Sequence, residues 1–250
     1  MKKANLKMVA ALLVAMLLFE SCTETSRDKQ ESNRYNICLI LDGSDRLSKQ
    51  NGIPQVSVKQ ILEIAQILTS NGTGSFYVCY VDENCDNNEI ALLEFQQEKP
   101  IKLRIEDKPS YMKMAEYKKL AAKYHIDSLT YSSGLANTIE KFTKDCEKIC
   151  RMAYSNEVAK QKNGSDVNGA INQAIRLLRA SEHQTDFSYI VLVSDGCDNI
   201  GKDLTPIPES TKLFTVNTNV AKHQYKELVS KEFASLEQVT NYIFNNKCEL

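Results

Sequence analysis

Residues 35–46, "YNICLILDGSDR", join a mostly apolar run to a short polar cluster. A run with so few polar positions is typical of a strand that is covered on both faces, as the strands of a parallel sheet are. The cluster that follows begins with Asp42, Gly43 and Ser44, which would lie at the carboxyl end of that strand. The stretch therefore predicts a buried strand and a polar loop that begins where the strand ends.

Further apolar runs predict more strands of the same sheet. Most of them are nearly continuous in apolar residues, like the first run, which indicates strands that are buried on both faces. The third run follows the second closely enough for an antiparallel hairpin at the sheet edge. The predicted strands are 35–41, 76–81, 90–95, 189–194 and 213–217.

Amphipathic helix patterns lie between and after these strands. Strands that alternate with such helices predict an α/β fold with a doubly wound, mostly parallel sheet, flanked by helices and carrying one antiparallel edge strand. The segment around 99–160 is longer than a crossover helix needs, and we interpret it as a helical insertion. The predicted helical stripes are 58–68, a weak one at 114–124, 135–153, 167–178, 222–233 and 235–244.

Three polar segments are predicted to meet at one edge of the sheet. In an open sheet of this kind, ligands bind beyond the carboxyl ends of the strands, where the strand order reverses. Asp42 and Asp195 are each the first acid after an apolar strand, and Ser165 opens the helix that leads into the Asp195 strand. Each has a plainer explanation, a helix N-cap for Ser165 and a common turn pair for each aspartate and its glycine. Their joint occurrence favours a binding site.

The ordered set "DGSDR", "NGSDVNGAI" and "VLVSDGCDN" resembles the signature of von Willebrand factor A domains, over roughly residues 35–245. The resemblance implies a metal-ion-dependent adhesion site in which Asp42 and Ser44 take the first two positions of an Asp-x-Ser-x-Ser triad. Ser165 then takes the position of a later Thr or Ser, and Asp195 takes the last position. It also implies a non-enzymatic module for adhesion or protein binding, which shares a divalent cation such as Mg²⁺ with a carboxylate of its partner.

One residue departs from that pattern. The third position of the triad, a hydroxyl residue in the family, is Arg46 in this chain. A guanidinium beside Asp42 and Asp195 can replace the cation as an internal salt bridge, and the domain would then be a metal-free structural scaffold. Alternatively, Arg46 points outward, and Asp45 or water supplies the missing ligand. The sequence leaves both alternatives open.

Enzyme chemistry is the least favoured class. "DGSD" resembles the Asp-x-Asp start of haloacid-dehalogenase-like phosphatases, but Ser44 stands where those enzymes need a second acid. The sequence has no Ser-His-Asp, zinc or phosphate-loop pattern. The 31 basic residues nearly balance the 32 acidic ones, so no nucleic-acid footprint is indicated either.

The first residues predict export rather than fold. Three lysines precede an apolar run at 8–19, as in a signal peptide, here predicted at 1–21. The run ends at Ser21-Cys22, which resembles the relaxed lipobox of Bacteroidetes-type lipoproteins and implies acylation of Cys22. Residues 22–34 are polar and predict a flexible tether to the domain at 35–250. The chain would then be lipid-anchored at the outer membrane of the cell envelope, with a protein partner there; the alternative is a cleaved secretory signal.

The chain contains eight cysteines, so seven lie beyond the lipobox, and an odd number cannot all pair. Cys38 and Cys79 fall in apolar strands and are predicted to be buried thiols. Cys146 and Cys150 are neighbours on one helix and are poorly placed to bridge. The remaining three lie in polar surroundings, where a surface disulfide between two of them is an open alternative: Cys85, Cys197 and Cys248.

Overall fold

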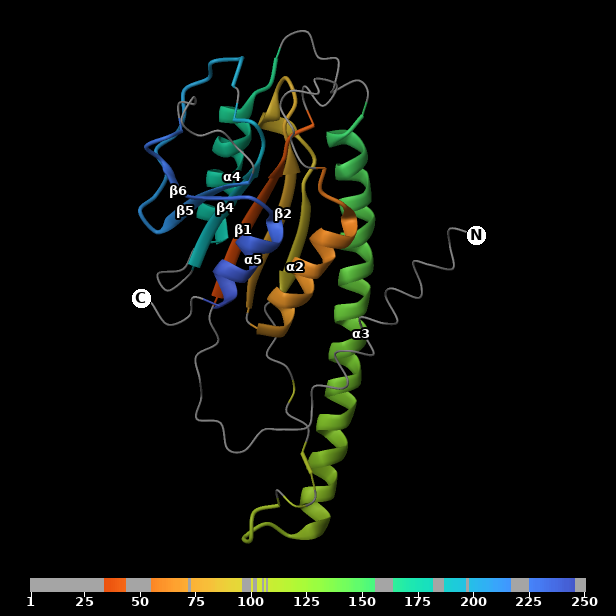
Figure 1. The fold of residues 1–250 in the computed structure, drawn as a ribbon. Helices are drawn as coiled ribbons and strands as arrows, with labels where there is room; N and C mark the ends of the chain where they lie inside the picture. Colours follow the sequence, from red (N-terminus) through yellow and green to blue (C-terminus); the bar gives the residue numbers. More distant parts are fainter. Residues whose placement is uncertain are drawn as a thin grey trace. The chain divides into compact units, whose positions relative to one another are not determined.

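The structure is a computed structural model (Figure 1). It describes residues 34–43, 55–71, 73–95, 100, 103–104, 106, 108–155, 164–181, 187–196, 198–216 and 225–245. The described chain divides into two compact units. One contains the described residues between 100 and 141, and the other contains residues 34–95 and 142–245 with the gaps given above.

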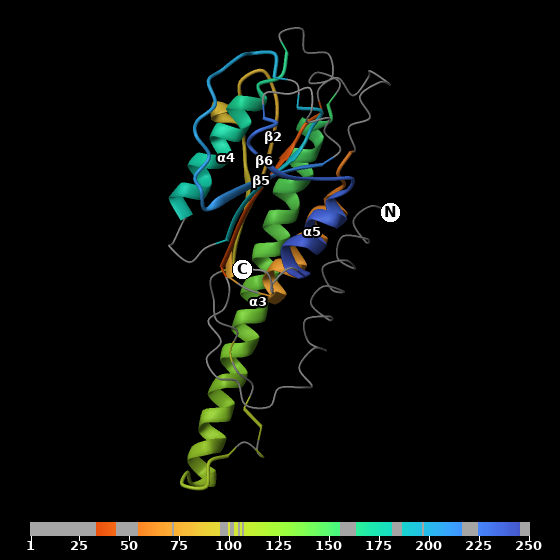
Figure 2. The same cartoon turned by 60° about the vertical axis from the view of Figure 1, so that its left-hand side comes forward.

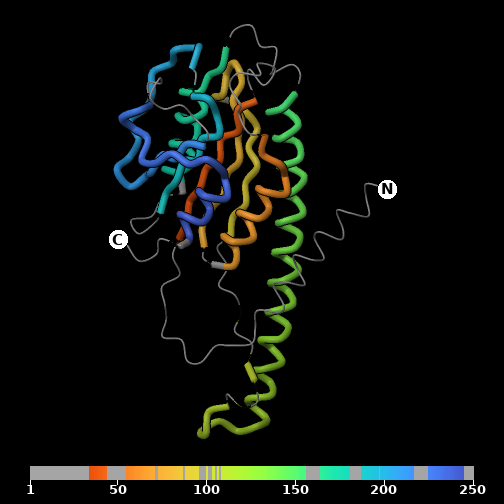
Figure 3. Tube along the Cα trace, in the orientation of Figure 1, coloured from red at the N-terminus to blue at the C-terminus, as the bar shows by residue number. Residues whose placement is uncertain are grey.

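The second unit is built on a six-stranded sheet in the order β3-β2-β1-β4-β5-β6. All neighbouring pairs are parallel except β2 with β3. The central strand β1 pairs with both β2 and β4, so the strand order reverses between β1 and β4 (Figure 3). This confirms the predicted doubly wound, mostly parallel sheet with one antiparallel edge strand. The strands are β1 (Arg34–Leu41), β2 (Thr73–Tyr80), β3 (Ala91–Phe95), β4 (Phe187–Val193), β5 (Thr211–Val216) and β6 (Val229–Phe233).

Helices cover both faces of this sheet, which is why the central strands are apolar at successive positions. Helix α4 (Val167–Ser181) packs on the face that carries Cys38 and Ile40 of β1. On the opposite face, Ile37 of β1 lies against helices α2 (Val58–Asn71) and α5 (Leu236–Asn245). Figure 2 shows α4 and α5 on opposite sides of the strands.

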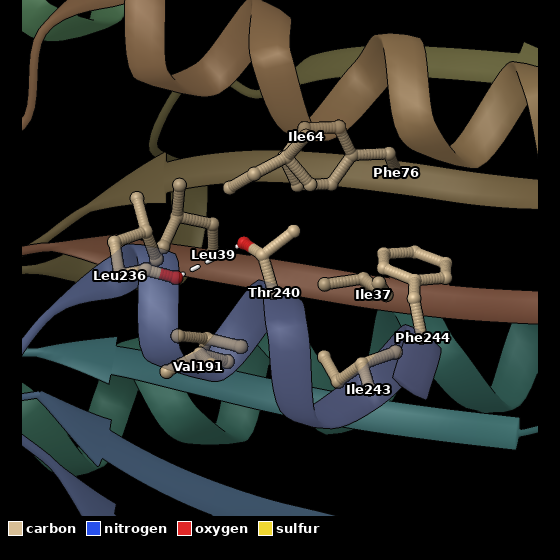
Figure 4. Close-up of a pocket in the computed structure, with 10 residues that line it drawn as sticks. Ile37, Leu39, Ile64, Phe76, Val191, Leu236, Thr240, Ile243 and Phe244 are labelled. Carbon is tan, nitrogen blue, oxygen red and sulfur yellow. Dashed lines mark hydrogen bonds between the residues drawn. The ribbon is translucent and has the colours of Figure 1, made fainter. Parts of the chain in front are cut away.

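The contact between α5 and the sheet leaves only a small apolar gap (Figure 4). Its volume is about 10 Å³, and its lining includes Ile37, Phe76 and Val191. The one hydroxyl drawn there, that of Thr240, donates to the carbonyl of Leu236 at 3.0 Å. A space of this size holds at most one water molecule, so the gap belongs to the packed core and does not bind a larger ligand.

Helix α3 (Met114–Ala153) is one continuous helix of 40 residues, whereas the sequence indicated two separate stripes. The residues between the stripes include no proline, and Thr130 and Ser132 donate to carbonyls four residues earlier. Hydroxyls bonded in this way remain compatible with a helix. Beyond residue 141, α3 belongs to the unit that contains the sheet, where the Phe142 ring lies 5.6 Å from that of Phe76.

The prediction of a helix at 222–233 was wrong. Within the described part of this segment, the amides of Leu228 and Val229 both donate to the carbonyl of Tyr225, which completes only one turn. The chain then forms β6, which pairs in parallel with β5. The three central residues of β6, at the edge of the sheet, are exposed and polar, and the segment shows no strand pattern. Pairing with β5, not local propensity, decides its conformation.

The described cysteines are all free thiols. Cys38 and Cys79 are buried as predicted, with their sulfur atoms 3.8 Å apart. The open alternative of a surface disulfide does not hold for Cys85, because its side chain is fully buried and its free thiol donates to the carbonyl of Asp166 at 3.2 Å. Cys197, Cys248 and the predicted lipidation site Cys22 lie outside the described residues.

The buried thiols of Cys85 and Cys146 and the half-buried thiol of Cys150 predict a loss of stability at high pH. Burial raises the pKa of Cys150 from 9.0 to about 11, and it also raises the pKa of Cys85 and Cys146. Above pH 9 the unfolded chain therefore loses protons that the folded chain keeps, and the free energy of unfolding falls as the pH rises. We expect the urea midpoint, measured with reductant present, to fall between about pH 8 and about pH 10.

Removing one of these thiols provides the control. Cys150→Ala is expected to reduce the dependence on pH over that range, because one group with a raised pKa is gone. A midpoint that stays constant in the native protein would contradict burial of these cysteines as thiols.

Candidate functional site

Asp42 lies at the point where the strand order reverses. Leu41 of β1 is paired with Val193 of β4, and the amide of Asp42 donates to the carbonyl of Val193 at 3.0 Å. The Asp42 side chain is 1% exposed, and one of its carboxylate oxygens, Oδ2, accepts a hydrogen bond of 2.6 Å from Ser194 Oγ. A buried carboxylate requires hydrogen bonds or a nearby cation. Asp42 therefore lies in the packed interior at the carboxyl end of β1, and it is not an exposed turn residue.

Ser194 links Asp42 to the loop that follows β4. Its hydroxyl donates to Asp42 and also accepts from the amide of Gly196 at 2.8 Å. Gly196 has a φ of 78°, which places it in the left-handed region that glycine adopts without strain. Asp195, between these two residues, is half-buried. The sharp turn after β4 thus holds Asp195 beside the end of β1.

Ser165 lies two residues before Val167, the first residue of α4, and it is not the residue that caps this helix. The cap is Asp166, whose Oδ1 accepts from the amide of Gly169 at 2.9 Å, three residues later. Ser165 is buried, and its carbonyl accepts from the amide of Asn199 at 3.1 Å. The plainer explanation of Ser165 as the N-cap was therefore wrong by one residue, and the segment before α4 is bonded directly to the loop after β4.

The structure thus places Asp42, Ser165 and Asp195 in three polypeptide segments at the carboxyl edge of the sheet, the upper edge in Figure 1. Hydrogen bonds join the end of β1 to the turn after β4, and that loop to the start of α4. Ser44, Asp45 and Arg46 lie outside the described residues. We call the set Asp42, Ser44, Ser165 and Asp195 the rim residues.

The sequence did not single out Asp86, Asp166 and Lys202, which interact at this edge. Lys202 Nζ donates to Asp166 Oδ2 at 2.7 Å and to Asp86 Oδ2 at 3.0 Å. The hydrogen bond from Lys202 lowers the pKa of Asp86, and the hydrogen bond to Asp166 raises the pKa of Lys202. An aspartate just before an amphipathic helix is an N-cap signal that could have identified Asp166. No local pattern indicates Lys202.

Acidic side chains exceed basic ones in the described loops at this edge. An excess of carboxylates creates a negative potential that attracts cations. Lys202 is the basic residue within the described parts of these loops, and Arg176 of α4 and Lys148 of α3 form ion pairs with Asp86 and Glu89 there. The acidic residues there are Asp42, Asp82, Glu83, Asp86, Glu89, Asp166, Asp195, Asp198 and Asp203.

The rim residues fit a hard cation by the chemistry of their donors. Mg²⁺ prefers carboxylate, hydroxyl and water oxygens in six-fold coordination, and Asp42, Asp195 and Ser165 supply such oxygens. Among the described residues, no three or more His, Cys, Asp or Glu side chains are arranged to hold a metal ion. A site made partly of serine hydroxyls is of a different kind, and Ser44 lies outside the described residues.

Comparison with known proteins does not assign this chain to a family. No family model matches this chain, and the search of curated proteins finds no significant match. Within the part of the chain that the structure describes, none of the helices has the length and apolar character that crossing a membrane requires.

Proposed function

We propose that the protein is a non-enzymatic binding module of the von Willebrand factor A type, which engages a partner protein through the rim residues. The buried carboxylate of Asp42, bonded to Ser194 at the reversal of strand order, is the observation that carries this proposal. In doubly wound sheets this position is where ligands bind. The order of the three motifs along the chain supports the same function.

A divalent cation is the proposed means of binding. Asp42, Asp195, Ser44 and Ser165 would hold Mg²⁺ or Mn²⁺, and the ion would supply an open coordination position for a carboxylate of the partner. The excess of acidic side chains at this edge supports cation binding, because it lowers the electrostatic cost of bringing a positive ion there. Asp45 and Arg46 would modulate the affinity.

The proposed location follows from the N-terminal sequence. A signal peptide at 1–21 would direct export and be removed, and acylation at Cys22 with a tether at 22–34 would then hold the module at the cell envelope, on the outer membrane. A partner protein of the envelope is then within reach of the rim residues. The metal-free scaffold, closed by Arg46, is the alternative that the following experiment separates from this function.

The test is calorimetric titration of Mg²⁺ and Mn²⁺ into the full chain in detergent. We expect the native protein to bind, and Asp195→Asn to weaken the affinity by on the order of 10-fold or more, because a carboxylate ligand is lost. Asp203→Asn is the matched control. It removes an exposed acid of the same loop whose backbone carbonyl, not its side chain, accepts from Asn172.

Three outcomes decide between the alternatives. Binding that is weakened by Asp195→Asn and unaffected by Asp203→Asn supports the cation-dependent module. A further variant, Arg46→Ser, is titrated in the same way. If this variant binds the cation and the native protein does not, the arginine has replaced the ion, which supports the metal-free scaffold. Equal effects of the two asparagine variants would show only a response to net charge and would remove Asp195 from the mechanism.

A further inference from the structure

Lys202 connects three segments at the carboxyl edge of the sheet. Its ammonium donates to Asp166 at the start of α4 and to Asp86 in the turn after β2. It also donates to Asn84 Oδ1 at 3.2 Å. Lys202 itself belongs to the loop after β4 that carries Asp195. One side chain therefore joins this loop to the two segments beside it.

The bond from Lys202 to Asp166 is the shortest of these contacts, and its acceptor is a buried carboxylate. Asp166 is fully buried, and its carboxylate has two further donors, the amides of Gly169 at 2.9 Å and Cys85 at 3.2 Å. The Lys202 side chain is 32% exposed, so it approaches a buried charge from the solvent side. Removing one partner of such a pair leaves the other charge buried without compensation, which is costly.

The backbone of the same loop is also fixed to α4. Asn168, in the first turn of α4, donates from Nδ2 to the carbonyl of Lys202 at 2.5 Å and from its amide to Asp198 Oδ1 at 3.1 Å. The amide of Asn199 donates to the carbonyl of Ser165 at 3.1 Å. The rim residue Ser165 takes part in one of these bonds, and the rim residue Asp195 belongs to the loop that the bonds connect to α4.

We propose that Lys202 is a positioning residue of the rim: its ammonium, between Asp86 and Asp166, holds the loop that carries Asp195 against the start of α4. The separation of Asp195 from Ser165 is then set before any ligand binds. This inference deepens the proposed cation site and rests on it for its effect on binding. Its effect on the loop itself is independent of any cation.

The sign of the effect on cation binding separates positioning from simple charge. A lysine close to a cation site repels the cation, so removing its charge by electrostatics alone would strengthen binding. Loss of positioning has the opposite effect, because a ligand held less firmly must be ordered when the cation binds. A variant without the ammonium therefore gives opposite results under the two explanations.

The experiment compares Lys202→Met with Lys202→Arg in the full chain in detergent. Amide hydrogen exchange reports the loop directly, through the amides of Asn199 and Gly201, which donate to Ser165 O and Asp198 Oδ2. In Lys202→Met we expect exchange at these amides to accelerate by on the order of 10-fold, with β1 and β4 unchanged, and Mn²⁺ affinity to fall by on the order of 10-fold. Lys202→Arg is expected to retain the native exchange rates and the native Mn²⁺ affinity, because a guanidinium can also pair with carboxylates.

A matched control and a second variant complete the test. Lys212→Met removes a lysine at the start of β5, at the amino ends of the parallel strands and away from the rim residues. It is expected to change neither the exchange rates nor the Mn²⁺ affinity. If Lys202→Met fails to fold, the double variant Asp166→Asn with Lys202→Met removes both charges and retains an N-cap residue, and it is expected to show the same faster exchange.

Unchanged exchange at Asn199 and Gly201, or tighter Mn²⁺ binding by Lys202→Met, would overturn the positioning role. If the native protein binds no Mn²⁺, the proposed cation site fails. The exchange measurement still decides whether Lys202 holds the loop, so the two failures are distinguishable.

Discussion

Replacing Gly43 with alanine is expected to lower the free energy of unfolding of the unit that contains the sheet by about 3 kcal/mol or more, the upper end of the range for overpacked sites. A Cβ atom at Gly43 would overlap the carbonyl oxygen of Ala153 at the end of α3. It would also lie 2.7 Å from the carbonyl carbon of Ala153 and 3.1 Å from Cδ1 of Tyr154. The obstacle is mainly backbone, so no rotation of a side chain relieves it.

The end of α3 cannot easily move away from Gly43. The amide of Tyr154 donates to the carbonyl of Cys150 at 3.1 Å, and its phenol oxygen accepts from the amide of Val56 at 3.0 Å. The loop after β1 would have to shift instead, and with it the residue that precedes it, Asp42. If the proposed cation site exists, a loss of cation binding is therefore expected to accompany the loss of stability.

Urea unfolding followed by circular dichroism measures this effect, with Gly134→Ala as the control. Gly134 lies within α3, and a Cβ atom there meets no other atom within 4 Å. Alanine is the better helix former by roughly 0.5 to 1 kcal/mol, so the control is expected to be neutral or stabilising. A Gly43→Ala variant as stable as the native protein would show that the end of β1 does not pack on α3 in this way.

The central strands could be predicted from the sequence because burial on both faces leaves few polar positions. Strands β1, β2, β4 and β5 correspond to the continuous apolar runs, with ends that differ by a few residues. β6 could not be predicted in this way, since an edge strand with exposed side chains is specified by pairing with its neighbour. The doubly wound class depends on the alternation of helices and strands, and it was predicted correctly.

The site was only partly visible in the sequence. The first acid after each of two buried strands, Asp42 and Asp195, marks the carboxyl edge whatever the strand order is. The bond from Ser194 to Asp42 requires β1 and β4 to be neighbours, although about 150 residues separate them, and no local pattern reports that adjacency. Cys85 was misplaced for a related reason, because its polar sequence neighbours conceal a turn, Cys85–Asn87, that directs its thiol inward.

Asp42→Asn is expected to weaken Mn²⁺ binding and capture of the partner by on the order of 100-fold, while the protein stays folded. The amide has nearly the shape of the carboxylate, and its oxygen can still accept the bond from Ser194 Oγ. It lacks the charge that a divalent cation requires from a site with only two carboxylates. Titration of Mn²⁺ by calorimetry measures the first effect, and urea unfolding measures stability.

Asp82→Asn is the matched control for this change. Asp82 follows β2 at the same edge of the sheet, and its Oδ1 accepts from the amide of Asn84 at 2.8 Å, outside the proposed ligand set. Asp82→Asn measures how much the loss of one negative charge at this edge changes the Mn²⁺ affinity through long-range electrostatics. Added salt screens that contribution. An effect of Asp82→Asn as large as that of Asp42→Asn would contradict direct coordination by Asp42.

Ser194→Ala separates a binding role of Asp42 from a purely structural one. The substitution leaves an oxygen of Asp42 and the amide of Gly196 without the hydroxyl that serves both, at a cost of about 1 to 3 kcal/mol in stability. If Asp42 serves only to hold the end of β4, Asp42→Asn, which retains the bond from Ser194, should change neither stability nor any cation binding. Ser194→Ala should then lower stability and also leave any cation binding unchanged. If Asp42 binds the cation, Asp42→Asn weakens binding by on the order of 100-fold at nearly full stability. Ser194→Ala instead lowers stability and weakens binding less, because the carboxylate is still present.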